Sequence, residues 1–188
     1  MVQLFRIYCV ISYVSKKEHH TLLKMKQNDL ERRFKEIIEQ SNPVIKRVCY
    51  MYATSKDHFN DLYQESLINI WQGLKNFRGD SKVSTWIYRT CINTCISYFR
   101  KYGKNDSNND SIDSLFVDIA DENSEHLDNL KEMYRLISKL RKLDKAIIML
   151  WLDERPYDEI AEITGLTRNN VASRLRRIKE RIVNSANK

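Results

Sequence analysis

The stretch PYDEIAEITGLTRNNVASRLRRIKERI, residues 156–182, has the pattern of two short helices joined by a tight turn. Gly165 can adopt the left-handed backbone conformation that ends a helix, and Thr167 offers a hydroxyl that can cap the next one. Ala161 is small enough for the two helices to approach closely, and Val171 can pack beneath them. This spacing is typical of a helix-turn-helix, whose second helix enters the major groove of DNA.

The second helix of this stretch separates apolar side chains from basic ones. Its apolar residues recur at intervals of three or four, at Val171, Leu175, Ile178 and Ile182, which places them on one stripe. The other faces carry donors that reach phosphates and base edges. The candidates for DNA contacts are Thr167, Arg168, Asn169, Asn170, Ser173, Arg174, Arg176 and Arg177. A helical hairpin with a solvated basic face is the alternative interpretation of the same pattern.

Composition favours a helical protein. The chain of 188 residues contains only four Gly and two Pro, and 42% of its residues are hydrophobic. Few helix-breaking residues together with many Leu, Ile, Lys and Glu are typical of an all-α fold. The formal net charge of +7 suggests a polyanionic partner such as nucleic acid.

Charge is distributed unevenly along the chain. Residues 78–104 carry six Lys or Arg against one Asp, and residues 164–188 carry seven against one Glu. Between them, residues 105–132 carry nine Asp or Glu against one Lys. Because the acidic stretch is also rich in Asn and Ser, we expect a flexible linker between two small helical domains. The expected divisions are an N-terminal extension at 1–24, a helical domain at 25–102, the acidic linker at 103–126, and a second helical domain with the helix-turn-helix at 127–188. For residues 1–24, a peripheral, disordered extension and an upstream reading of the start codon are the alternatives.

The cysteines do not form a metal-binding pattern. Cys9, Cys49, Cys91 and Cys95 contain no C-x-x-C pair, and no His lies near enough in sequence for a zinc motif. We therefore expect small packing residues in a reduced, cytoplasmic protein without a metal site. The sequence shows no phosphate-binding loop, cofactor motif or nucleophile–base arrangement, so we expect neither a cofactor nor enzymatic activity. No apolar run approaches the length of a membrane span, so no membrane insertion is expected.

Helical periodicity also runs through the first domain. Pro43 is expected to break or restart a helix, and residues 58–75 have the pattern of a further helix with a polar face. Ser84 or Thr85 is expected to cap the next helix, over residues 86–102. That helix combines aromatic and basic side chains, a combination suited to nucleic-acid binding.

Residues 61–101 begin DLYQES, contain FRGDSKVSTWIYR and end YFRK. This block resembles the second conserved region of the sigma-70 RNA polymerase sigma factors, in their extracytoplasmic-function (ECF) group. Residues 140–182 are similar to the fourth region of that family, which ends in a helix-turn-helix. Ile92 and Ser97 replace the Arg and Asp usual at those positions, so the promoter contacts credited to them are not carried over. The third region of larger sigma factors is absent, as in the compact group.

The resemblance implies a transcription initiation factor that directs core RNA polymerase to promoters, recognises their −35 and −10 elements and assists their melting. Contacts to core polymerase are implied at Asp61, Gln64 and Glu65. Holding an unstacked base of the −10 element requires aromatic and cationic side chains. The implied −10 contacts are Phe77, Arg78, Lys82, Ser84, Thr85, Trp86, Arg89, Asn93, Arg100 and Lys101. For Trp86, packing in the core is an equal alternative. The −35 element is implied to meet the donors named above between Thr167 and Arg177.

Further partners and alternatives follow from the same comparison. The acidic linker is implied to thread toward the polymerase active-site channel, with a solvated tether as the alternative. An anti-sigma factor is a family expectation beside polymerase and promoter DNA. The competing hypothesis is a stand-alone helix-turn-helix regulator, which would not need residues 61–101. A recombinase would need a catalytic Ser or Tyr domain, which the sequence does not show.

Overall fold

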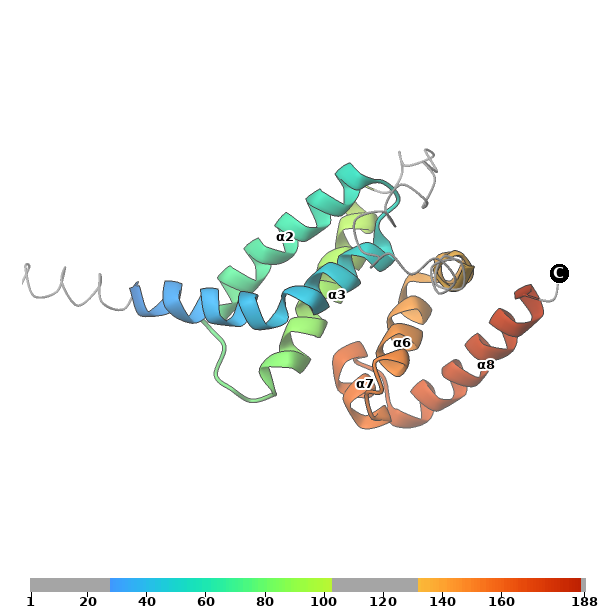
Figure 1. Cartoon of the computed structure of the whole chain (residues 1–188). Helices are drawn as coiled ribbons and strands as arrows, with labels where there is room; N and C mark the ends of the chain where they lie inside the picture. Colours follow the sequence, from blue (N-terminus) through green and yellow to red (C-terminus); the bar gives the residue numbers. More distant parts are fainter. Residues whose placement is uncertain (1–27, 103–131, 187–188) are drawn as a thin grey trace, which may run out of the picture. The chain divides into compact units, whose positions relative to one another are not determined.

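The computed structural model describes residues 28–102 and 132–186 (Figure 1). The chain divides into two compact units, Met1–Gln40 and Ser41–Lys188. The expected N-terminal extension at 1–24 and the acidic linker at 103–126 lie outside the described residues, and so does the start of the second helical domain expected at 127–188.

All regular secondary structure in the described part of the chain is helical, which confirms the all-α prediction. Within these residues, no helix is long and apolar enough to cross a membrane. In the first unit, residues 28–40 are helical. In the second unit, the helices are residues 41–52, α2 at Lys56–Leu74, α3 at Val83–Tyr102, residues 132–138, α6 at Lys142–Leu152, α7 at Tyr157–Thr164 and α8 at Arg168–Ala186.

Two helices of the second unit begin or continue where the sequence pattern indicated a break. Residues 41–52 are helical throughout, so Pro43 does not interrupt them. The helix expected at 58–75 starts at Lys56, because Ser55 caps it. The Ser55 hydroxyl accepts a hydrogen bond from the His58 N–H at 3.1 Å. The polar residues Ser55 and Lys56 therefore mark the start of a helix.

The start of α3 corrects a second expectation. Neither Ser84 nor Thr85 caps this helix, which begins at Val83, and the Trp86 N–H already donates to the Lys82 carbonyl at 3.0 Å. Thr85 is buried, and its hydroxyl donates instead to the Glu159 carboxylate at 3.0 Å. The Thr85 hydroxyl, which local sequence patterns assigned to a helix cap, thus bonds to a residue 74 positions away in the chain.

The core beneath α2 and α3 is apolar and includes three thiols. The helix α2 packs along α3. Cys49, Cys91 and Cys95 are fully buried and free, which confirms their expected role as packing residues. The buried apolar residues around them are Ile45, Val48, Leu62, Ile70, Leu74, Ile87 and Ile92.

The helices α6, α7 and α8 pack on one another around a second set of apolar residues. The stripe expected on α8 is buried at Val171, Leu175 and Ile178. Ile147 of α6 and Ile160 of α7 are also fully buried. The burial of apolar side chains from all three helices stabilises them as one cluster.

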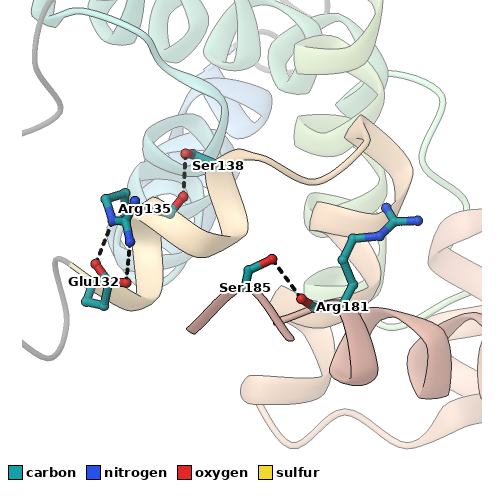
Figure 2. A network of polar contacts seen from close by, with 5 residues as sticks. All are labelled: Glu132, Arg135, Ser138, Arg181 and Ser185. Carbon is teal, nitrogen blue, oxygen red and sulfur yellow. Dashed lines mark hydrogen bonds and ion pairs between the residues drawn. The ribbon is translucent and has the colours of Figure 1, made fainter. Parts of the chain in front are cut away.

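Short polar contacts lie within the helix at residues 132–138 and within the last turn of α8 (Figure 2). Arg135 donates from Nε and Nη2 to the two carboxylate oxygens of Glu132, each at 2.6 Å, and the Ser138 hydroxyl donates to the Arg135 carbonyl at 2.8 Å. In the last turn of α8, the Ser185 hydroxyl donates to the Arg181 carbonyl at 2.9 Å. Each hydroxyl bonds within its own helix, as Ser often does in helices.

Candidate nucleic-acid interface

The helix-turn-helix has the local geometry that its sequence indicates. Gly165 has a φ of 71°, in the left-handed region, and its N–H bonds to the Ala161 carbonyl. The Leu166 N–H reaches the same carbonyl at 3.1 Å. Thr167 then accepts a hydrogen bond from the Asn170 N–H at 3.3 Å, which confirms the expected cap of α8. The turn is closed by hydrogen bonds at both helix ends.

The first turn of α8 presents polar side chains to solvent. Thr167, Arg168, Asn169 and Asn170 are all exposed, and Ser173, Arg176 and Arg177 continue the exposed set along the helix. Arg168 forms an ion pair with Asp158 at 3.0 Å, and both side chains remain largely exposed. Such a pair is weak in water and leaves Arg168 able to exchange its partner.

Arg174 differs from the other predicted −35 residues. Its Nη1 forms an ion pair at 3.1 Å with Oδ1 of Asp144, a residue of α6 whose side chain is only 10% exposed. This pair borders a pocket of about 170 Å³. The pocket is lined by Arg141, Asp144, Arg174, Arg177, Ile178 and Arg181. The pairing of Arg174 with Asp144 could not be predicted from local sequence patterns, because the two residues are 30 positions apart.

The three predicted polymerase contacts lie on α2. Asp61, Gln64 and Glu65 are exposed, and their spacing places them on one side of the helix. Asp61 also makes a contact within the protein, because the Tyr98 hydroxyl of α3 donates to its Oδ2 at 3.1 Å. The end of α3 therefore holds one carboxylate of this face in place.

A groove between α2 and α3 brings predicted polymerase and −10 residues together. Its volume is about 440 Å³. Glu65 lies on one wall, and Asn93 and Lys101 lie on the other. The Asn69 side-chain amide crosses between the helices to donate to the Thr94 hydroxyl at 3.0 Å. The two predicted contact sets are thus neighbours on one surface.

The loop before α3 and the first turn of α3 carry the aromatic part of the predicted −10 surface. The rings of Phe77 and Trp86 lie 4.8 Å apart, and both side chains are half-buried. A Cβ at Gly73 would lie 3.0 Å from the Trp86 ring, a tighter contact than side chains usually make, so Gly73 favours the close approach of α2 to this ring. Trp86 packs against α2 and Phe77 and remains partly exposed. The cationic members Arg78, Lys82, Arg89, Arg100 and Lys101 are exposed, as is Asn93, whereas Ser84 is half-buried.

A polar cluster joins α3 to the turn between α6 and α7. The Tyr88 hydroxyl donates to Asp153 Oδ2 at 2.5 Å, and Arg47 forms an ion pair with the other oxygen of that carboxylate. Arg155 lies over the Tyr88 ring, with 5.0 Å from its Cζ to the ring centroid, and pairs with Glu159 at 3.1 Å. Burial, together with the hydrogen bond to Asp153, raises the pKa of Tyr88 to about 12. Sequence reasoning missed this cluster, because its members are distant in the chain.

The described residues contain no group of three or more His, Cys, Asp or Glu that could hold a metal ion. The polar clusters they do form pair carboxylates with Arg, Tyr or Thr side chains rather than with one another. The exposed polar and basic side chains of α2, α3 and α8 are suited to contacts with other macromolecules and with DNA phosphates.

Comparison with known families matches both parts of the chain. Residues 37–105 match Sigma-70 region 2, and residues 130–182 match Sigma-70 region 4. The chain is 30% identical over 142 residues to the ECF RNA polymerase sigma-E factor of Haemophilus influenzae, covering 69% of this chain and 75% of that protein. It is 32% identical over 137 residues to the corresponding factor of Escherichia coli K12, covering 66% and 71%.

Solved structures share the fold. The sigma factor RpoE, in complex with the anti-sigma factor NepR from Bartonella quintana, aligns with a TM-score of 0.63 and 20% identity, covering 80% of this chain and 94% of that one. CnrH, in complex with the cytosolic domain of CnrY, aligns with a TM-score of 0.61 and 15% identity, covering 84% and 89%. Together with the two region matches and the sigma-E relatives, these findings place the chain among the ECF RNA polymerase sigma factors, as a promoter-recognising transcription initiation factor rather than a stand-alone regulator.

Proposed function

We propose that this sigma factor divides promoter recognition between two surfaces, with α8 reading the −35 element and the start of α3 engaging the −10 element. The observation that carries the proposal is the first turn of α8, where Arg168, Asn169 and Asn170 are exposed directly after a hydrogen-bonded turn. A recognition helix contacts base edges with its N-terminal residues, and Asn and Arg are suited to hydrogen bonding with bases.

The −10 surface would combine the partly exposed Trp86 with the cations around it. Bases stack on aromatic side chains, and neighbouring cations neutralise the backbone of the displaced strand. Lys82 precedes α3 and Arg89 lies in its second turn, and both are exposed. In this proposal they contact phosphates, while Trp86 supports an unstacked base with the exposed part of its ring.

The exposed face of α2 would bind core RNA polymerase through Asp61, Gln64 and Glu65. Its proximity to Asn93 and Lys101 in the groove between α2 and α3 supports a surface on which polymerase and the −10 strand meet. The polymerase would carry out the chemistry, and the sigma factor itself would have no catalytic activity. The protein would act in the cytoplasm, where its polymerase and promoters are.

The two matched regions support a division of the chain into two functional domains. The first domain at 25–102 would serve polymerase and the −10 element, and the second at 127–188 would serve the −35 element. The segment at 103–126 would link them. An anti-sigma factor is a further proposed partner, supported by the aligned sigma factor RpoE, which was solved in complex with the anti-sigma factor NepR.

Run-off transcription with purified core polymerase and a genomic library of templates tests the proposal. We expect specific transcripts whose start sites share −35 and −10 elements, and none from core polymerase alone. The absence of any specific transcript, together with tight binding of the free protein to duplex DNA, would contradict the proposed division of roles.

A matched pair of variants on α8 tests the −35 assignment. Asn169→Ala should reduce discrimination between the −35 element and a scrambled sequence by about 1–3 kcal/mol, the value of one good base contact. Asn184→Ala changes the same residue type in the last turns of the same helix, where Asn184 is also exposed, and should leave discrimination unchanged. Equal effects of the two variants would count against base reading by the start of α8.

A further inference from the structure

The ion pair between Asp144 and Arg174 joins the proposed DNA-reading helix to α6. The Asp144 side chain is 10% exposed and the Arg174 side chain is 41% exposed. A carboxylate so shielded from water needs a charged partner, and Arg174 supplies it at 3.1 Å. The Arg174 guanidinium is therefore committed to a protein contact, unlike the exposed side chains of Asn169 and Asn170 in the first turn.

The surroundings of Asp144 make it the centre of a positively charged pocket. Among the six residues that line the pocket, Asp144 is the one carboxylate and four are arginines. Three of these arginines, Arg174, Arg177 and Arg181, come from α8, and Arg141 precedes α6. Without the Asp144 charge, the like charges of Arg141 and the three α8 arginines would repel one another and push α8 away from α6.

Arg174 also lies at a position on α8 where a contact with α6 can control the rotation of α8 about its axis. It immediately precedes Leu175 and lies between Val171 and Ile178, the residues that bury α8. Successive residues of an α-helix are about 100° apart around the axis, since a turn takes 3.6 residues. Apolar contacts are not directional, whereas a 3.1 Å ion pair beside the stripe restricts the rotation of α8 about its axis.

We propose that Asp144 is a positioning residue for −35 recognition, which acts through Arg174 to hold the reading face of α8 at the required rotation. Arg174 serves promoter recognition through this contact and not by touching DNA. The inference rests on the proposed reading of the −35 element by α8, and it assigns a role in recognition to a residue of α6 that lies outside the helix-turn-helix.

A double-mutant cycle in the holoenzyme tests the inference. Asp144→Asn, Arg174→Met and the double variant are each assembled with core polymerase. Affinity is then measured for a duplex with the −35 element and for one with that element scrambled, over a range of salt concentrations. We expect each single variant to lower the ratio of the two affinities roughly tenfold, and the double variant to lower it no further, because contacting residues couple. The salt slope of Arg174→Met should equal that of the wild type.

Several outcomes would overturn the inference. If Arg174 binds a phosphate directly, Arg174→Met will weaken binding to both duplexes equally and reduce the salt slope by about 1. Effects that add in the double variant would likewise show that Asp144 and Arg174 act separately. A wild-type holoenzyme with no preference for the −35 element would instead refute the proposed function itself, so the two failures are distinguishable.

Two further variants separate positioning from stability. Asp144→Glu keeps the charge and should restore most of the affinity ratio that Asp144→Asn loses. Arg181→Met removes another arginine that lines the same pocket, and should leave the ratio unchanged. If Asp144→Asn lowers the melting temperature but leaves the affinity ratio of the folded protein intact, its role is structural and the inference is wrong.

Discussion

Asp153 is the residue through which α3 is held to the turn between α6 and α7. One carboxylate oxygen accepts the Tyr88 hydroxyl at 2.5 Å, and the other pairs with Arg47. The Tyr88 side chain is almost fully buried, so its hydroxyl has no access to bulk water to replace this bond. The stability of the contact therefore depends on Tyr88 keeping its proton.

This dependence predicts a loss of stability at alkaline pH. The pKa of Tyr88 rises from its ordinary value of 10.0 to about 12 in the folded protein, first through burial and then through the hydrogen bond to Asp153. Between these values the unfolded chain releases the proton while the folded chain keeps it, so the free energy of unfolding falls as pH rises. Below the ordinary value, the contribution is fully present.

Chemical denaturation of the wild type and of Tyr88→Phe between neutral pH and about pH 12 measures the effect. We expect the variant to be less stable at neutral pH, because Asp153 loses a donor, and to lose less stability as pH rises. Burial raises the pKa of Tyr134 as well, so some alkaline dependence should remain. Parallel pH profiles for the two proteins would show that Tyr88 titrates in the same way when folded and unfolded.

At the scale of the element, α2 shows how a helix start is fixed by one side chain. Ser55 has an extended backbone, with φ at −152°, and its hydroxyl accepts the His58 N–H. Without this acceptor, one of the amide groups at the helix start would lack a protein partner. Because α2 carries the proposed polymerase contacts at Asp61, Gln64 and Glu65, its first turns have functional importance.

Replacement of the cap gives a defined expectation. Ser55→Ala should lower the free energy of unfolding by about 1 kcal/mol, the usual value for a lost cap, whereas Ser55→Asn should retain most of the stability. Urea denaturation followed by circular dichroism compares both with the wild type. If both variants lose the same amount, the hydroxyl matters for its size or its surroundings and not for capping.

The elements also show what the sequence could and could not predict. Local signals were sufficient for the helix-turn-helix, because Gly165, Thr167 and the stripe from Val171 to Ile178 act within a few residues of one another. Thr85 was misassigned as a cap because its partner, Glu159, lies in another helix. The pairing of Arg174 with Asp144 was invisible for the same reason, since periodicity identifies the buried face but not the charged neighbour across it.

At the scale of the whole molecule, contacts join the two matched regions within the unit Ser41–Lys188. The Tyr52 hydroxyl donates to the Lys142 carbonyl at 2.7 Å, and the Lys142 ammonium lies 4.3 Å from the centroid of the Phe99 ring. Thr85 and Glu159 add a hydrogen bond between α3 and α7. These contacts place parts of regions 2 and 4 against each other while their exposed basic side chains remain in solvent.

The net charge of +7 and its concentration in two segments predict a steep dependence of promoter binding on salt. Each neutralised DNA phosphate contributes a slope of about −0.9 to the logarithm of affinity against the logarithm of salt concentration. Titration of the holoenzyme with promoter duplex at several potassium chloride concentrations, compared with core polymerase alone, gives the sigma contribution. A slope no steeper than that of core polymerase would show that the basic faces of this chain do not contact phosphates.

The three buried thiols can report how often the core beneath α2 and α3 opens. Cys49, Cys91 and Cys95 are each 0% exposed, so an alkylating reagent can reach them only in molecules whose core has opened. The labelling rate in native buffer therefore measures how often this part of the protein opens, without any denaturant. Peptide mass spectrometry can follow each thiol separately, and so show whether binding of core polymerase makes that opening rarer.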